Sequence, residues 1–355
     1  MESDLRAPLN DLIRRAEAGV PEAMFLLGKA YCLGEGGVRR DQSQAVVWWR
    51  KAAEAGLVVA MNNLAISLAF GHGVEPDFDE AFRWWNQAAD AGMPESMTNI
   101  GSAYYHGHGV ESDKGKAFEW WHKAAKLRFP QAMGLVAKAY SLGEGVGQDP
   151  SQAATWWLEA AELGVPEAML SLGVAYFQGN GVERNLVLGI RWWQKAAEKN
   201  VPMAWFYLGE AYLKTQELDF DFQKAIECYM RAAVGGVRNA ITSLKNPVLK
   251  ADLIQKVEFW RQRAEDGDNL SRMFMGQVNI HGLVGPTDRA QAAHWWEAAA
   301  NGGNVDAMVL LGQSYEEGFG GAGDLKLAFE WYVKASELGS VAAIAKLAGL
   351  KGGTA

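Results

Sequence analysis

Aromatic doublets recur along this chain at a constant spacing. Tryptophan pairs begin at positions 48, 84, 120, 156 and 192, each 36 residues after the one before. The register continues at Cys228-Tyr229, Phe259-Trp260, Trp295-Trp296 and Trp331-Tyr332, with one shorter step of 31 residues before Phe259. A fixed period of this length is typical of a repeat array in which each unit packs on its neighbours. The length of 355 residues therefore does not indicate separate globular domains.

Each repeat carries signals for two helices joined by a turn. Proline favours the first position of the first helix, as at Pro21 and Pro166. Glycines such as Gly34 and Gly36 then favour a turn with positive φ. An Asp or Asn suited to capping the second helix follows in all nine repeats: Asp41, Asp77, Asp113, Asp149, Asn185, Asp221, Asp252, Asp288 and Asp324.

The expected core combines the doublets with small residues. In the first helix, Met24 and Leu27 share a face with Gly28, whose small size lets the paired helix approach closely. Fourteen of the fifteen tryptophans lie in doublets, beside an alanine groove. We interpret both tryptophans of each doublet as core, and not as a platform for carbohydrate or bases. Methionines recur at one position of the first helix, and we interpret this methionine column as core residues too: Met24, Met61, Met97, Met133, Met169 and Met308.

The repeat pattern divides the chain into five segments. We predict an N-terminal capping helix in residues 1–17, six repeats in 18–233, a shortened degenerate repeat in 234–265, two repeats in 266–337, and a capping helix with a tail in 338–355. The shortened repeat lacks the glycine turn and contains Asn246-Pro247, which discourages helix continuation. We expect the coupling between neighbours to be weakest at residues 234–251, so that the array opens there in two blocks.

The repeat resembles a known family in its pattern A-x-x-x-L-G-x-x-Y-x-x-G-x-G-V, followed by Asp, Ala, an aromatic doublet and K/R-A-A-E. In the first repeat the match is carried by Ala23, Leu27, Gly28, Tyr31, Gly34, Gly36, Val38, Asp41, Ala45, Trp48, Trp49, Ala52, Ala53 and Glu54. It resembles the Sel-one-like (Sel1-like) repeat family, a branch of the tetratricopeptide-like (TPR-like) solenoids. The resemblance implies an all-α, right-handed α/α superhelical solenoid of about nine two-helix repeats with terminal capping helices. It also implies an adaptor that assembles protein complexes.

The cysteine content separates this chain from the secreted branch of that family, which pairs two cysteines in each repeat. Only Cys32 and Cys228 are present, and they lie five repeats apart. We predict that both thiols are free, because residues this far apart in a solenoid cannot form a disulfide. Free thiols and the acidic start at Glu2 and Asp4 favour a cytoplasmic location over secretion.

Charge and hydropathy argue against two kinds of partner. The net charge is -8, and no dense Lys/Arg tract is present to neutralise a row of phosphates, so we do not expect nucleic acid as a partner. No segment approaches the roughly 18 uninterrupted apolar residues of a membrane span.

The sequence offers no recognisable catalytic or metal constellation. It contains no G-x-S-x-G, S-x-x-K, P-loop or H-E-x-x-H motif, so we expect no enzyme and no cofactor. His72 and His108 share a turn position in adjacent repeats, and His106 lies beside His108. We expect no metal there, because helix layers lie about 10 Å apart whereas metal ligands converge to about 2 Å from one ion.

The repeats differ most on the face of the first helix that turns away from the core. We predict that this face lines a concave groove and binds a protein partner. The candidate contact residues are Phe25, Lys29, Cys32, Asn62, Ile66, Tyr105, Lys138, Leu170, Phe177, Phe206 and Glu210. The position that follows Cys32 in the repeat also carries apolar residues where solvent exposure is expected, namely Leu33, Phe70 and Leu142. The alternative is that helix ends bury some of them, notably Phe70 and Leu142, between repeats.

The expected function is therefore a non-enzymatic scaffold or adaptor that grips a protein in the concave groove. One alternative is an immunity or inhibitor protein that neutralises a co-encoded toxin or enzyme. A second alternative, from another class, is a hydrolase that acts on peptidoglycan-like substrates.

Overall fold

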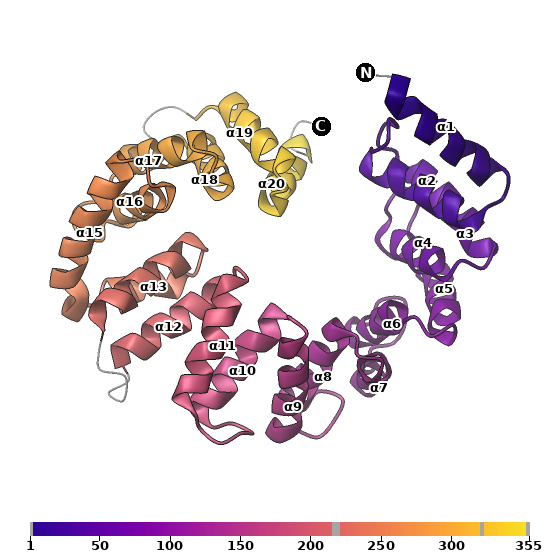
Figure 1. Ribbon diagram of the computed structural model, residues 1–355, viewed down its shortest axis with the longest axis horizontal. Helices are drawn as coiled ribbons and strands as arrows, with labels where there is room; N and C mark the ends of the chain where they lie inside the picture. The colour runs from indigo at the N-terminus through magenta and orange to yellow at the C-terminus, as the bar shows by residue number, and fades with distance from the viewer. Residues whose placement is uncertain (1–2, 215–220, 320–322, 353–355) are drawn as a thin grey trace. The chain divides into compact units, whose positions relative to one another are not determined.

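The computed structural model describes residues 3–214, 221–319 and 323–352, which form twenty α-helices and one 3-10 helix (Figure 1). The first helices of the repeats are α2 (Pro21–Leu33), α4 (Val58–Phe70), α6 (Pro94–His106), α8 (Pro130–Leu142), α10 (Pro166–Gln178), α12 (Pro202–Lys214), α14 (Arg238–Leu244), α16 (Asn269–His281), α18 (Val305–Glu317) and α20 (Val341–Gly352). The second helices are α1 (Ser3–Glu17), α3 (Gln42–Glu54), α5 (Phe78–Asp90), α7 (Lys114–Lys126), α9 (Pro150–Glu162), α11 (Leu186–Glu198), α13 (Phe222–Val234), α15 (Lys250–Glu265), α17 (Arg289–Asn301) and α19 (Leu325–Glu337). Consecutive helices pack in pairs, which confirms the all-α solenoid of two-helix repeats.

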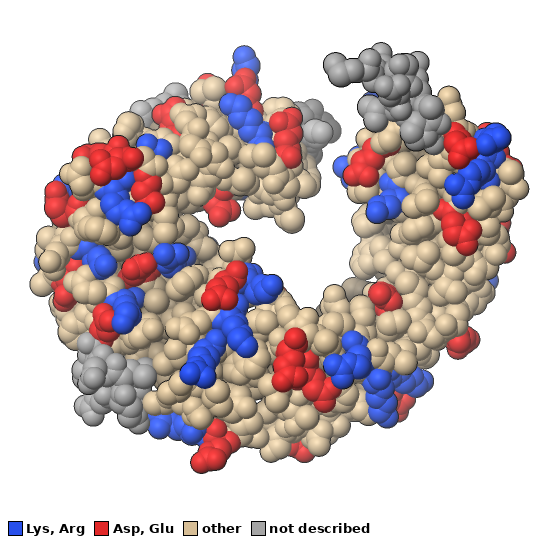
Figure 2. Space-filling model, viewed as in Figure 1, with Lys and Arg blue, Asp and Glu red and all other residues tan. Residues whose placement is uncertain are grey.

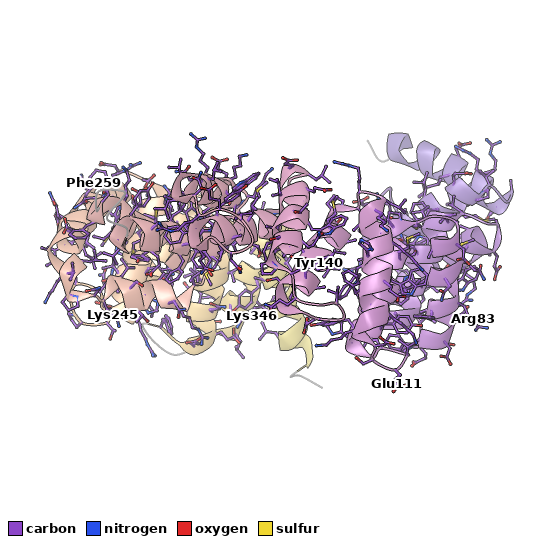
Figure 3. The ribbon with its side chains drawn as sticks, turned by 90° about the horizontal axis from the view of Figure 1, so that it is seen from below. Arg83, Glu111, Tyr140, Lys245, Phe259 and Lys346 are labelled. Carbon is purple, nitrogen blue, oxygen red and sulfur yellow. The ribbon has the colours of Figure 1, made fainter. Side chains whose placement is uncertain are left out.

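Two compact units can be distinguished, Met1–Gly189 and Ile190–Ala355, and each is described by itself. In the first unit, α4 and α6 lie on one side of the stack and α5 and α7 on the other (Figure 1). We call the side formed by α2, α4, α6, α8 and α10 the inner face, and the side formed by the second helices the outer face. Tyr140 lies among the helices of this unit, whereas Arg83 and Glu111 lie at its edge (Figure 3). The first unit thus has one face formed by first helices and another formed by second helices.

The helix ends follow the predicted capping signals with one exception. The Asp41 carboxylate accepts a hydrogen bond from the backbone N–H of Gln44 at 3.0 Å. Equivalent bonds to Asp77, Asp113, Asp149, Asn185, Asp221, Asp288 and Asp324 confirm seven further caps. Gly34 ends α2 with φ 75°, a backbone conformation that favours glycine.

The prediction that Asp252 caps a helix is wrong. Asp252 lies within the first turn of α15, which begins at Lys250. The helix begins early because a 3-10 turn, Pro247–Leu249, leads directly into it and has its own cap at Asn246. Asp252 instead accepts a hydrogen bond from Gln223 Nε2 at 2.9 Å, which ties α15 to α13.

The second member of most tryptophan doublets is buried, although Trp157 is only partly buried. Trp49 is 7% exposed and Trp121 is 5% exposed. Trp48 and Trp120 are only partly buried, and lysine ammonium groups lie 4.3 Å and 4.1 Å from their ring centroids. The first member thus packs against the core clusters but is only partly buried, so the prediction that both members are core is confirmed for it only in part. The indole also interacts with the lysine three residues later on the same helix.

The degenerate repeat at 234–265 is irregular but well packed. Its first helix, α14, has seven residues, whereas α15 has sixteen. Leu244, Leu249, Leu253 and Trp260 are buried in one cluster with residues of α13 and α16. The weak coupling expected at residues 234–251 stays a prediction, and this core opposes it.

Two further features concern thiols and hydropathy. Cys32 is partly buried and Cys228 is buried, and both are free, which confirms the prediction. In the part of the chain that the structure describes, none of the helices is long and apolar enough to cross a membrane.

Candidate protein-binding face

Large apolar side chains are exposed on the inner face of the first unit. Leu33 is 50% exposed, Phe70 58% and Leu142 56%, at the C-terminal ends of α2, α4 and α8. The alternative interpretation, in which Phe70 and Leu142 are buried between repeats, is therefore wrong. His106 and Gln178 are exposed at the corresponding positions of α6 and α10.

On α2 the exposed residues differ by one position from two of the three predicted contact residues. Leu26, Lys29 and Leu33 are exposed on α2, whereas Phe25 and Cys32 are partly buried. Phe25 packs against a core cluster, and its carbonyl oxygen accepts a hydrogen bond from Trp49 Nε1 at 3.3 Å. Because successive helical residues are about 100° apart, a shift of one residue turns the stripe toward the core.

Asn62 lies in an interface between repeats and is only 6% exposed. Its Oδ1 atom accepts hydrogen bonds from Ser96 Oγ and Asn99 Nδ2, both at 3.0 Å. The prediction that Asn62 contacts a partner from an open surface is wrong, because the carboxamide ties α4 to α6. Ile66 is partly buried on the same helix.

Tyr105 and Lys138 lie beside each other where α6 meets α8. The Tyr105 hydroxyl donates to Glu144 Oε2 at 2.8 Å, and Lys114 Nζ donates to Glu144 Oε1 at 2.7 Å. The bonds from Lys114 and Tyr105 lower the pKa of the Glu144 carboxyl. Lys138 is exposed and lines the same pocket as Tyr105, and its positive charge also helps to lower the pKa of Glu144.

The remaining predicted residues are partly buried. Leu170 and Phe177 lie on α10 in the first unit, each partly covered. In the second unit Phe206 packs against the cluster around Tyr229, with ring centroids 5.9 Å apart. Glu210 accepts a hydrogen bond from the Tyr229 hydroxyl at 2.7 Å. The structure thus gives Glu210 an internal role in addition to any contact with a partner.

Three pockets occupy equivalent places between successive first helices of the first unit. The pocket between α2 and α4 has a volume of about 210 Å³, that between α4 and α6 about 360 Å³, and that between α6 and α8 about 120 Å³. Each has a core tryptophan in its wall, namely Trp49, Trp85 or Trp121. Residues at matching positions of the next first helix line them as well: Asn63 with Ile66, Asn99 with Ser102, and Leu135 with Lys138. We call these three pockets the pocket row.

The middle pocket has an aromatic rim. Phe70, Phe78, His106 and His108 line it, and the two imidazoles are stacked with centroids 5.3 Å apart. No group of three or more potential metal ligands occurs among the described residues. Their turn positions predict solvated histidines and not metal ligands, and the sequence gives no sign of the pocket that they line.

Charges of both signs are interspersed over the described surface seen in Figure 2. That face offers no large field of Lys/Arg. The pocket row is correspondingly mixed, with aromatic walls, amide and hydroxyl groups, and Lys138 near Glu144.

The paired, stacked helices define this chain as an α-helical repeat protein of the solenoid class. The model of the Sel1 repeat matches residues 21–57, 58–93, 94–129, 130–165, 166–201, 270–304 and 305–340. The chain therefore belongs to the Sel1 repeat family. Residues 202–269, which include the degenerate repeat, fall between the matched stretches.

Solved structures show the same fold. A protective antigen of uropathogenic Escherichia coli with an SLR fold is 27% identical, with 99% of this chain and 84% of that chain covered and a TM-score of 0.52. A Sel1 repeat protein from Oxalobacter formigenes is 30% identical over 61% of this chain and 88% of that chain, with a TM-score of 0.57. An immunity protein from Pseudomonas aeruginosa is 19% identical over 69% and 80% of the two chains, and its TM-score of 0.38 is too low to bear on function. A comparison with curated proteins found no match.

Proposed function

We propose that this protein is a non-enzymatic cytoplasmic scaffold that holds an extended segment of a protein partner along the inner face of its first unit. The observation that carries the proposal is the pocket row, which lies on the same face as the exposed Leu33, Phe70 and Leu142. Exposed apolar groups concentrated on one surface mark interaction sites. A Sel1 repeat array suits such a role because its stacked units build an extended binding surface.

The spacing of the pockets favours an extended occupant. Stacked helices lie about 10 Å apart, so neighbouring pockets are separated by a similar distance. A polyproline II segment advances about 3.1 Å per residue and turns once every three residues. Every third side chain of such a segment would therefore face the pocket row.

The polar groups of the pocket row support a peptide as the ligand. The Asn63 amide, together with the Asn99 Oδ1 and Ser102 Oγ atoms as acceptors, can bond to the exposed backbone of an extended segment. The aromatic walls at Phe70 and Phe78 suit apolar side chains. A row of phosphates would instead require a continuous basic strip.

Site-specific photo-crosslinking tests the proposal. A photoreactive amino acid at position 70 or 142 should form a covalent adduct with a protein partner in cells. The matched control is position 47, because Val47 is 45% exposed but lies on α3 at the outer face. Adducts from position 47 alone would place the binding surface on the outer face and contradict the proposal.

The same experiment separates the alternatives. Identification of a toxin or enzyme in the adduct, with inhibition of that toxin by the purified protein, would make this scaffold an immunity protein. Turnover of peptidoglycan fragments by the purified protein would contradict the non-enzymatic proposal.

A further inference from the structure

The middle pocket of the pocket row has the most room. Its volume is about 360 Å³, against about 210 Å³ and 120 Å³ for the pockets on either side. Cys32 lines the first pocket and Tyr105 lines the third, whereas Ala69 stands at the equivalent position of α4. Alanine has the smallest of these three side chains. The middle pocket can therefore hold a larger side chain of the bound segment than either neighbour can.

The wall of the middle pocket differs from that of the third pocket in charge. Among the described residues that line the middle pocket, none is Lys, Arg, Asp or Glu. The third pocket is lined by both Lys138 and Glu144. A charged group that entered the middle pocket would lose its hydration without meeting an opposite charge, which is costly. The wall therefore favours an uncharged occupant.

The polar side chains of this wall present hydrogen-bond acceptors. Asn99 Nδ2 donates to Asn62 Oδ1 at 3.0 Å. Ser102 Oγ donates to the carbonyl oxygen of Thr98, also at 3.0 Å. These bonds leave Asn99 Oδ1 and the lone pairs of Ser102 Oγ available as acceptors. An occupant that carries an O–H or N–H group can donate to them.

The indole of Trp85 forms part of the wall and carries a buried donor. Trp85 is 3% exposed, and its Nε1 atom has no hydrogen-bond partner among the described residues. In the next repeat, Trp121 Nε1 donates to a backbone carbonyl oxygen at 3.3 Å. A methyl group at Gly101 would come within 2.6 Å of that Nε1 atom. Since Ala65 stands at the equivalent position beside Trp85, its methyl group keeps the indole from taking the same place.

Aromatic rings border the opening of the middle pocket. The rings of Phe78 and His108 have centroids 6.0 Å apart, and the rings of His108 and His106 have centroids 5.3 Å apart. Phe70, which is 58% exposed, lines the pocket as well. Aromatic side chains pair in offset-stacked or edge-to-face arrangements. This border therefore favours a flat ring as the occupant.

We propose that the middle pocket binds a tyrosine side chain of the partner segment, an inference that rests on the proposed function. The phenol ring contacts the aromatic border, and its hydroxyl can donate to Asn99 or Ser102 and accept from an indole N–H. Phenylalanine carries no such group, and tryptophan can only donate. Phosphotyrosine would bring negative charge into a wall without Lys or Arg, so the pocket selects the unmodified residue.

Peptides of the form Pro-Pro-X-Pro-Pro test this preference, because proline favours the polyproline II conformation. Position X is tyrosine, phenylalanine, alanine or phosphotyrosine, and NMR titration of the full chain measures the affinity. The phenylalanine peptide should bind roughly fivefold more weakly than the tyrosine peptide, as loss of one hydrogen bond predicts. The alanine and phosphotyrosine peptides should bind roughly tenfold more weakly or less. The tyrosine peptide should shift the imidazole signals of His106 and His108 but not that of His294, which lies on α17.

Two variants locate the effect. Phe70→Ala should weaken binding of the tyrosine peptide roughly threefold to tenfold, because one ring of the border is lost. Leu142→Ala is the matched control, since Leu142 is 56% exposed at the equivalent position of α8. This variant should leave the preference for tyrosine over phenylalanine unchanged.

Several outcomes would overturn the assignment of tyrosine. They are equal affinity for the tyrosine and phenylalanine peptides, tighter binding of the phosphotyrosine peptide, no binding of any peptide, and a Phe70→Ala variant that binds as before. The photo-crosslinks from positions 70 and 142 do not depend on which side chain fills the pocket. Crosslinks without a preference for tyrosine would therefore refute this inference alone, whereas loss of the crosslinks would refute the proposed function.

Discussion

The indole of Trp121 lies against Gly101 so closely that a methyl group at position 101 would come within 2.5 Å of Trp121 Cδ1. The Trp121 Nε1 atom donates to the carbonyl oxygen of Thr98 at 3.3 Å. The glycine thus lets the aromatic ring of α7 reach the backbone of α6. The buried Nε1 atoms of Trp85 and Trp296 have no hydrogen-bond partner among the described residues, so this bond does not form in every repeat.

We predict that Gly101→Ala destabilises the protein by about 1–3 kcal/mol, because the added methyl overpacks the contact with Trp121. Chemical denaturation followed by tryptophan fluorescence measures the loss. The matched control is Gly134→Ala, where a methyl group at a helical position would meet nothing within 4 Å. That substitution should stabilise the chain by up to about 1 kcal/mol through helix propensity. Equal losses in both variants would show that Trp121 does not require the glycine.

The sequence specified the helices well because their signals are local. Proline at Pro94, the glycine at Gly107 and the cap at Asp113 act through the backbone of a few neighbouring residues, and the structure forms each as predicted. The wrong prediction of a cap at Asp252 also reflects this dependence on local backbone structure. A cap requires a helix that begins beside it, and the 3-10 turn from Pro247 moved that beginning upstream.

The binding face was less predictable because it depends on packing between repeats. The period identifies the first helix but not the angle at which it packs. The prediction therefore chose Phe25, which is partly buried, when the neighbouring Leu26 is the exposed residue. Long-range hydrogen bonds carry no signature in a single repeat. The bond between Asn62 and Ser96 joins residues 34 positions apart, and sequence reasoning did not detect it.

The two thiols should differ in reactivity. We predict that a thiol reagent modifies Cys32 rapidly in the native protein, since it is partly exposed beside the first pocket. Cys228 should react only after unfolding, because burial raises the pKa of its thiol to about 12 and excludes the reagent. A titration before and after denaturant should count one and then two thiols. Fast modification of Cys228 in the native protein would contradict the packing of α13.

Hydrogen exchange tests the expected seam at residues 234–251. If the shortened repeat couples weakly, amides of α14 should exchange faster than those of α6 or α8. The buried Leu244 and Leu249 oppose this outcome, because they join α14 and the 3-10 turn to the core of the second unit. Slow exchange throughout α14 would show that an irregular sequence does not produce a mechanical seam here.

Acid should remove the stabilisation provided by Glu316. The Tyr332 hydroxyl donates to Glu316 Oε2 at 2.7 Å and Lys346 Nζ donates to it at 3.1 Å. The bond from Tyr332, followed by that from Lys346, lowers the pKa of the Glu316 carboxyl. A lowered folded-state pKa stabilises the fold above the ordinary carboxyl pKa, and this contribution is lost as the pH falls through the folded-state value.

We therefore predict that Glu316→Gln lowers the melting temperature at neutral pH and that its difference from the original protein shrinks as the pH falls below the ordinary carboxyl pKa. Tyr332→Phe should cost about 1 kcal/mol at neutral pH, since it removes one hydrogen bond and leaves the ring buried. Glu317→Gln is the matched control, because the neighbouring Glu317 is exposed and should give little change at any pH. Thermal unfolding across this pH range measures all three variants. A Glu316→Gln difference that grows as the pH falls would mean that the carboxylate destabilises the contact between α18, α19 and α20, contrary to the hydrogen bonds that it accepts.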